Sequence, residues 1–136
     1  MAILAKIETE SWEGGRSRRE TFERATTSIL REQFSRLDGD RMDALWIEFE
    51  RVGELCVGGG PDRFIAVAFA ADGSSSHVEV ESDRIDPVEL QVGGQTGSYA
   101  SKMVLPAGLA LEIAERFLAS GQYDRSQQWV EDCPPG

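Results

Sequence analysis

The sequence predicts a single α+β domain over residues 1–136, with a mostly antiparallel sheet of about five to six strands and two main helices packed on it. Several segments that alternate apolar and polar residues follow one another across short turns, which favours antiparallel pairing. Two other segments repeat apolar residues at helical spacing. A chain of 136 residues is long enough for one domain with a core and too short to predict two.

The first 52 residues are expected to hold a strand, a helix and a second strand. Residues 2–8 alternate apolar side chains, and two glycines interrupt the pattern within residues 12–19. From 18 to 37, apolar residues recur at helical spacing with Arg and Glu on the opposite side, which predicts an amphipathic helix that ends at the Asp-Gly-Asp of 38–40. Residues 43–52 alternate again, as in a half-buried strand.

Four more strands are predicted in the middle of the chain. Strands at 54–57 and 63–71 are separated by Gly-Gly-Gly-Pro-Asp, which is typical of a tight connection. The second of these strands is apolar on both sides, so it should be central and covered on both faces, with helices as the expected cover. Strands at 77–81 and 86–92 follow across short turns.

A loop, a helix and a short edge strand are predicted to end the domain. Residues 93–99, Gly-Gly-Gln-Thr-Gly-Ser-Tyr, are expected to form a flexible connection. Pro106 opens the second helix and Gly121 stands at its C-cap, with an apolar stripe between them. A short edge strand is expected around Trp129, and residues 132–136 should form a flexible tail.

No constellation of residues in the sequence indicates catalysis or a bound cofactor. His77 is the only histidine, and no nucleophile-elbow pattern accompanies it. His77, Glu79 and Glu81 share one face of their strand but lack a thiolate or second histidine, so we expect no metal site. The loop at 93–99 lacks the Lys-Ser/Thr ending of a P-loop, and no helix starts directly behind it. We therefore predict that the protein is not an enzyme.

The charge of the chain is strongly negative and unevenly distributed. There are 14 basic and 24 acidic residues, which gives a net charge of −10. Residues 72–92 hold six carboxylates against one arginine and so account for −5 of this charge. A chain this acidic repels nucleic acid and membrane surfaces and attracts a basic partner. Solubility alone is the alternative explanation for the charge.

The compartment is expected to be the cytoplasm. The first residues show no secretory or transit pattern, and no window approaches the roughly 18 apolar residues of a membrane span. Cys56 and Cys133 lie far apart and outside any Cys-x-x-Cys pattern, so we expect reduced thiols, with a disulfide as the alternative.

The order of elements over residues 88–131 is distinctive. A strand leads into Gly93, Gly94 and Gly97, and a helix then runs from Pro106 to Phe117, Leu118 and Gly121, followed by Trp129 and Glu131. This order resembles the C-terminal half of the first-numbered immunity-protein family of bacterial polymorphic toxin systems, and the N-terminal half is similar to that family in plan only. The valine between Trp129 and Glu131 is a departure, because the family would have an acidic residue directly after the tryptophan.

The resemblance implies an α+β domain encoded beside a toxin, often a deaminase acting on nucleic acid, which the domain neutralises by binding. We therefore expect an immunity protein that binds a cognate toxin through an acidic surface. The expected partner-binding residues are Glu79, Glu81, Asp83, Asp86, Glu89, Gln95, Tyr99 and Trp129. Trp12 and Trp46 are further candidate anchors, with a place in the core as the alternative.

Two other functions stay open at this point. One is a small-ligand-binding or enzymatic domain that uses a pocket between the sheet and the C-terminal helix, and the other is a dimerising module.

Overall fold

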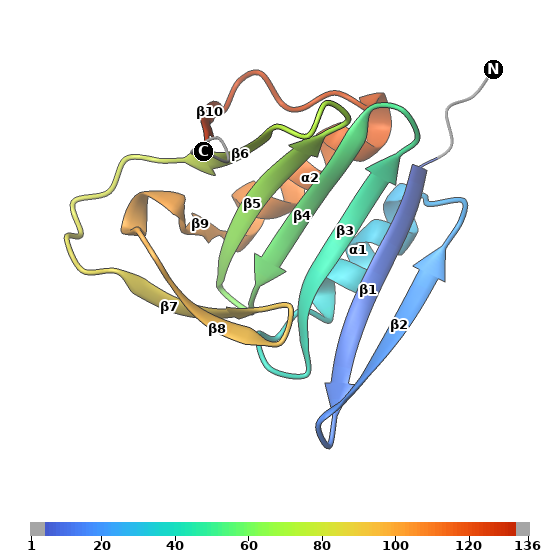
Figure 1. Cartoon of the computed structure of the whole chain (residues 1–136), viewed down its shortest axis with the longest axis horizontal. Coiled ribbons are helices and arrows are strands. Elements are labelled where there is room, and N and C mark those ends of the chain that lie inside the picture. Colours follow the sequence, from blue (N-terminus) through green and yellow to red (C-terminus); the bar gives the residue numbers. More distant parts are fainter. Residues whose placement is uncertain (1–4, 133–136) are drawn as a thin grey trace.

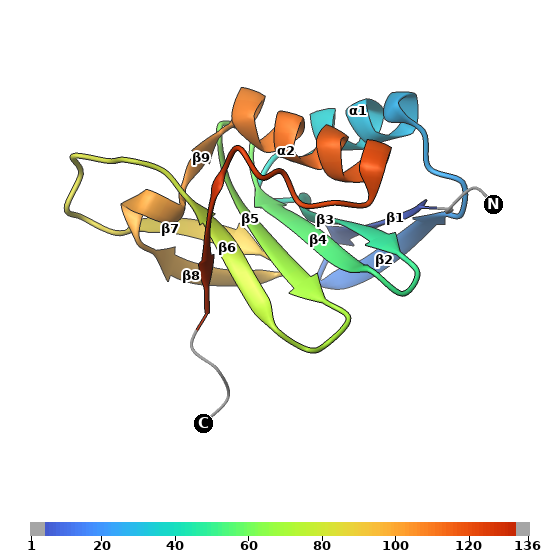
Figure 2. The same cartoon turned by 90° about the horizontal axis from the view of Figure 1, so that it is seen from above.

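Two helices cover one face of a twisted antiparallel sheet, and a β-hairpin covers part of the other face (Figures 1 and 2). The structure is a computed structural model that describes residues 5–132. Within these residues the main sheet has eight strands, and the hairpin forms a separate two-stranded sheet. The α+β class and the two helices are confirmed, whereas five to six strands was too low a number.

The strands of the main sheet are β1 (Ala5–Glu13), β2 (Arg16–Phe22), β3 (Met42–Phe49), β4 (Gly53–Gly59), β5 (Arg63–Ala70), β6 (Ser75–Glu79), β9 (Leu105–Pro106) and β10 (Gln128–Glu131). Seven of them run in the order β10-β6-β5-β4-β3-β1-β2, and β9 pairs with β5. The remaining elements are the hairpin strands β7 (Val88–Val92) and β8 (Gln95–Tyr99), the helices α1 (Thr27–Ser35) and α2 (Ala107–Ser120), and the short 3-10 helix η1 (Ser101–Met103).

The predicted helix over 18–37 is wrong in its first half. β2 pairs with β1 over seven residue pairs, across a turn made by Gly14 and Gly15. The helix begins only at Thr27, where the side chain of Thr26 caps it by accepting a hydrogen bond from the N–H of Ile29 at 3.2 Å. β2 is an exposed edge strand with three arginines and one glutamate, and these polar residues resemble the polar side of a helix.

The main core lies between the sheet and the two helices. Four side chains of α2 are completely buried in it: Ala110, Ile113, Ala114 and Phe117. Gly121 ends this helix in the left-handed conformation, with φ of 70°, as predicted. Strand β5 is covered by the helices on one face and only in part on the other, where Ile65 packs into a second, smaller core beneath the β7–β8 hairpin and Phe69 is exposed.

Residues 93–99 are not a flexible connection but the turn and second strand of this hairpin. Gly93 and Gly94 have φ of 63° and 81°, the pair of positive angles that a tight two-residue hairpin turn requires. The hairpin approaches the sheet closely at Gly58 of β4. A Cβ at that position would lie only 2.5 Å from a methyl group of Val92, so glycine permits this contact.

Asp43 ties the hairpin to the sheet. It lies at a β-bulge in β3, where the pairing register with β1 shifts, and bulges of this kind redirect side chains. The residue is completely buried. Its Oδ2 accepts hydrogen bonds from the backbone N–H of Gly94 at 2.8 Å and from Nε2 of Gln91 at 3.0 Å. Its Oδ1 has no hydrogen-bond partner among the described residues.

The ends of the domain agree in part with expectation. The strand predicted at 2–8 is β1, of which residues 2–4 lie outside the described part of the chain. The edge strand expected around Trp129 is β10, and it pairs with β6. Asp132 does not belong to a tail, because its N–H donates to the carbonyl of Ser75 at 2.9 Å. Residues 133–136, with Cys133, lie outside the described residues.

We expect Asp43→Ala to lower the free energy of unfolding by about 1–3 kcal/mol, because the N–H of Gly94 and the side-chain amide of Gln91 would lose a charged acceptor at a partly buried site. Urea unfolding at constant pH measures this change. The matched control is Asp40→Ala, which removes an exposed carboxylate nearby and should change stability by less than about 0.5 kcal/mol. Equal stabilities of the two variants would contradict the role given to Asp43.

Candidate functional site

Most of the predicted partner-binding carboxylates lie along one side of the molecule, at the left of Figure 1. Glu79 lies in β6 and Glu89 in β7. Glu81, Asp83 and Asp86 lie in the segment of residues 80–87 that joins these strands, here called the acidic loop. Chain folding therefore brings them to one projecting edge of the molecule (Figure 1).

Four of these carboxylates lie close together in the chain. Glu81, Asp83, Asp86 and Glu89 are exposed, and none takes part in an ion pair among residues 5–132. Some carboxylates elsewhere are paired: Arg19 lies 3.4 Å from Glu8 and 3.1 Å from Glu10, Lys6 lies 3.2 Å from Glu48, and Arg31 lies 2.7 Å from Glu115. Other exposed carboxylates are unpaired but scattered, whereas residues 81–89 gather four of them with Arg84 as the one basic residue among them.

The acidic loop is held by η1 at two points. The N–H of Val80 donates to the carbonyl of Lys102 at 2.7 Å, and the hydroxyl of Ser101 donates to the carbonyl of Arg84 at 2.5 Å. Within the loop, the N–H of Arg84 donates to the hydroxyl of Ser82 at 3.2 Å. These bonds fix the backbone from which the carboxylates project.

Glu79 has a structural partner that the exposed carboxylates lack. Nε2 of His77 lies 2.8 Å from Glu79, and Nδ1 lies 2.6 Å from Asp132. A carboxylate only accepts hydrogen bonds, so both bonds can form at once only when both ring nitrogens of His77 carry a proton. Burial lowers the pKa of His77, but the bonds to the two carboxylates outweigh it and raise the pKa above 6.5. His77 therefore clamps the end of β10 to β6.

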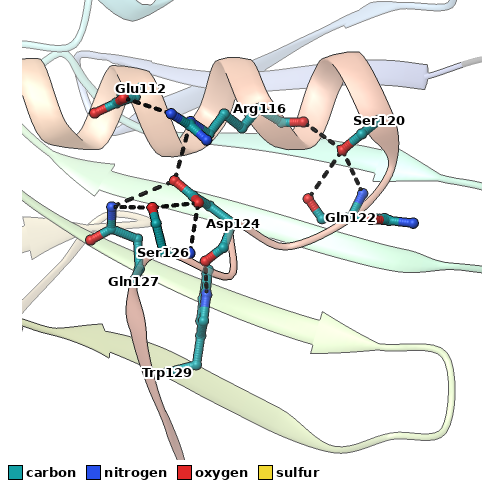
Figure 3. A network of polar contacts seen from close by, with 8 residues as sticks. All are labelled: Glu112, Arg116, Ser120, Gln122, Asp124, Ser126, Gln127 and Trp129. Atoms are coloured by element: carbon teal, nitrogen blue, oxygen red, sulfur yellow. Dashed lines mark hydrogen bonds and ion pairs between the residues drawn. The ribbon is translucent and has the colours of Figure 1, made fainter.

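Trp129 lies against the core and not on the exposed surface. Its ring is half-buried and packs 5.4 Å from the ring of Tyr123. Its indole N–H donates to the carbonyl of Asp124 at 2.8 Å (Figure 3). The buried carboxylate of Asp124 in turn accepts hydrogen bonds from the N–H and hydroxyl of Ser126 and lies 3.4 Å from Arg116 (Figure 3). These contacts fix the chain between α2 and β10, so Trp129 stabilises the fold.

The remaining predicted contact residues lie on β8. Gln95 is exposed, directly after the hairpin turn. Tyr99 is half-buried against the second core, and burial raises the pKa of its hydroxyl. The two other tryptophans differ in setting: Trp46 is half-buried on the sheet, and the ring of Trp12 packs on Gly94. Gln95 therefore lies at the turn end of the hairpin, away from the acidic loop that precedes Val88, and Tyr99 mainly supports the hairpin.

Two exposed apolar side chains were not predicted from the sequence. Ile85 of the acidic loop is 96% exposed, and Phe69 of β5 is 44% exposed. Ile85 stands between charged residues in Ser-Asp-Arg-Ile-Asp-Pro, away from any alternating or helical apolar pattern. That isolation is the one signal in the sequence that could have identified it.

The predicted ligand pocket between the sheet and α2 is occupied by the main core. A cleft of about 820 Å³ lies elsewhere, beside the β1–β2 turn and the β7–β8 turn. Its lining mixes Arg36 and Arg41 with Asp38 and Asp40, around Trp12. This lining holds no nucleophile, such as a cysteine, placed beside a base among the described residues.

Chemistry at the other reactive groups is limited in the described part of the chain. No group of three His, Cys, Asp or Glu side chains in residues 5–132 lies close enough to hold a metal ion, and Glu81 lies beyond the end of β6. Burial raises the pKa of the Cys56 thiol to about 12, which suppresses its reactive thiolate form.

Among the described helices, none has the length and apolar character that crossing a membrane demands.

We expect His77→Gln to remove a pH-dependent part of the stability. Because the pKa of His77 is raised in the folded state, its contribution is fully present below about pH 6.5 and is lost as the pH rises through the folded pKa. The two carboxylates are 26% and 34% exposed, so we expect this contribution to be about 1 kcal/mol. Thermal or urea unfolding of both proteins across that range measures it. A difference between wild type and variant that does not change with pH would contradict the clamp.

No family model matches the chain, and no curated protein matches its sequence. The resemblance of residues 88–131 to an immunity-protein family therefore rests on the residues quoted above. The function is inferred from that resemblance and from the surface that the structure exposes.

Proposed function

We propose that this protein is an immunity protein that binds a cognate toxin in the cytoplasm and neutralises it. It acts by binding alone, without catalysis or a cofactor, and its partner is a protein and not nucleic acid or a membrane. The observation that carries this proposal is the cluster of four exposed carboxylates within residues 81–89, none of them in an ion pair among the described residues: Glu81, Asp83, Asp86 and Glu89.

Unneutralised charge of this kind favours a basic partner for a physical reason. A toxin that acts on nucleic acid needs Lys and Arg side chains where the phosphate backbone binds. Carboxylates on a projecting loop attract the same side chains, so they speed the encounter and compete with the substrate for the basic surface. A deaminase acting on nucleic acid is the toxin class that the resemblance implies.

The way in which the acidic loop is held also supports binding. Hydrogen bonds from Val80 and Ser101 fix its backbone before any partner arrives. A loop that is already ordered loses less conformational entropy on binding than a disordered one.

Co-expression with the toxin encoded in the neighbouring reading frame tests the function. We expect the protein to restore growth of cells that express the toxin and to co-purify with it. If the protein neither restores growth nor co-purifies, the proposed function is wrong.

The acidic surface is tested separately with Asp83→Asn, Asp86→Asn and Glu89→Gln combined. We expect the association rate with the toxin to fall about tenfold at low ionic strength, and the difference from wild type to shrink as salt screens the charges. Stopped-flow or surface-based kinetics at several salt concentrations measure both effects.

The control for this variant removes the same number of charges elsewhere. Glu23→Gln, Glu32→Gln and Glu50→Gln combined neutralise three exposed carboxylates that lie away from the acidic loop. We expect this control to change the association rate by less than about threefold, because only its smaller effect on net charge remains. Equal losses in the two triple variants would show that net charge matters and that the acidic loop is not the interface.

A further inference from the structure

Ile85 is the most exposed large apolar side chain in the described part of the chain. It is 96% exposed, whereas Phe69, the other large apolar residue that is exposed there, is 44% exposed. A single exposed apolar residue is common on protein surfaces and indicates nothing by itself. The position of Ile85 in the acidic loop and the bonds around it carry the inference.

The backbone directly before Ile85 is fixed through both polar groups of one residue, Arg84. The carbonyl of Arg84 accepts from the hydroxyl of Ser101, and the N–H of Arg84 donates to the hydroxyl of Ser82. Pro87 follows two residues after Ile85 and restricts the conformation of Asp86. The isoleucine therefore projects from an ordered backbone within the acidic loop, the segment that stands out at one edge of the molecule (Figure 1). This ordering lowers the entropic cost of burying it in a partner.

The charges around Ile85 form a rim about an apolar centre. Arg84 and Asp86 are its exposed neighbours in the chain, and the carboxylates of Asp83 and Glu81 lie earlier in the same loop. Protein interfaces have this composition, with an apolar, fully desolvated centre and a polar rim that excludes water. Carboxylates in the rim complement basic side chains in the rim of the opposite surface.

We propose that Ile85 is the apolar anchor of the acidic loop and that it inserts into an apolar pocket of the toxin whose rim carries Arg or Lys side chains. This inference rests on the proposed function and deepens it by stating the chemistry of the partner's site. The carboxylates and the isoleucine then act on different steps of binding. The charges speed the encounter, and burial of Ile85 slows dissociation.

The test compares Ile85→Ser with Phe69→Ser in binding to the toxin domain encoded in the neighbouring reading frame. We expect Ile85→Ser to weaken the affinity roughly 10- to 100-fold, through faster dissociation with an unchanged association rate and unchanged salt dependence. Ile85→Leu should keep the affinity within about threefold, because it stays apolar with a similar volume. Phe69→Ser, which removes the other exposed apolar side chain from the open part of the sheet, should leave the affinity unchanged.

Folding is checked by thermal unfolding of each variant without the toxin. Ile85→Ser should unfold at the same temperature as wild type, because its side chain is almost fully exposed. If wild type binds and Ile85→Ser binds equally well, the anchor is overturned while the proposed function stands. If Phe69→Ser alone weakens binding, the partner sits on the sheet and the anchor is again overturned. If wild type does not bind, the proposed function fails and the anchor fails with it.

Discussion

A buried carboxylate, Asp43, holds the layer on which the candidate surface depends. The helices are secured by a large apolar core, but the core at the β7–β8 hairpin has only three buried residues, Ile65 of the sheet and Val88 and Leu90 of β7, with five partly buried ones around them. A contact this small cannot fix a two-stranded sheet by the hydrophobic effect alone. The bonds from Asp43 to Gly94 and Gln91 supply direction as well as stability. Since β7 begins directly after the acidic loop, the same bonds set where that loop ends.

The other end of the acidic loop is fixed in a similar way. β6 lies near the edge of the sheet, and the contacts of His77 with Glu79 and Asp132 secure it to the last described residues. The loop between these two attachments carries three carboxylates, Glu81, Asp83 and Asp86, against one arginine, Arg84. Like charges held close together repel one another and lower the stability of the folded state. Glu8, Glu48 and Glu115 have ion-pair partners that offset such repulsion, and the carboxylates of the acidic loop have none among the described residues. A role of these charges in binding accounts for this loss of stability.

The sequence predicts elements best where burial imposes a period. The apolar stripe of α2 and the apolar run of β5 predict these two elements correctly, because their side chains pack in the core. β2 was predicted wrongly as part of a helix. Because this edge strand has no buried face, its sequence does not alternate apolar and polar residues. β8, Gln-Thr-Gly-Ser-Tyr, gives no strand signal either, and only its two-glycine turn indicates a hairpin. Of the predicted site, the acidic residues were found from composition, whereas the exposure of Ile85 and the burial of Trp129 depend on tertiary contacts that no local pattern contains.

In a surface of this kind, charge attracts the partner, and the fit of an apolar side chain discriminates between partners. An acidic loop without an apolar centre would attract many basic proteins, because Coulomb attraction is long-ranged and tolerant of geometry. Discrimination requires a contact that is lost when the fit is wrong, and an apolar side chain that is buried only in a matching pocket is such a contact. In the free protein, Ile85 stays in water among charged neighbours. The carboxylates of the acidic loop repel a second copy of the same loop, so they also keep the free protein from associating with itself through Ile85.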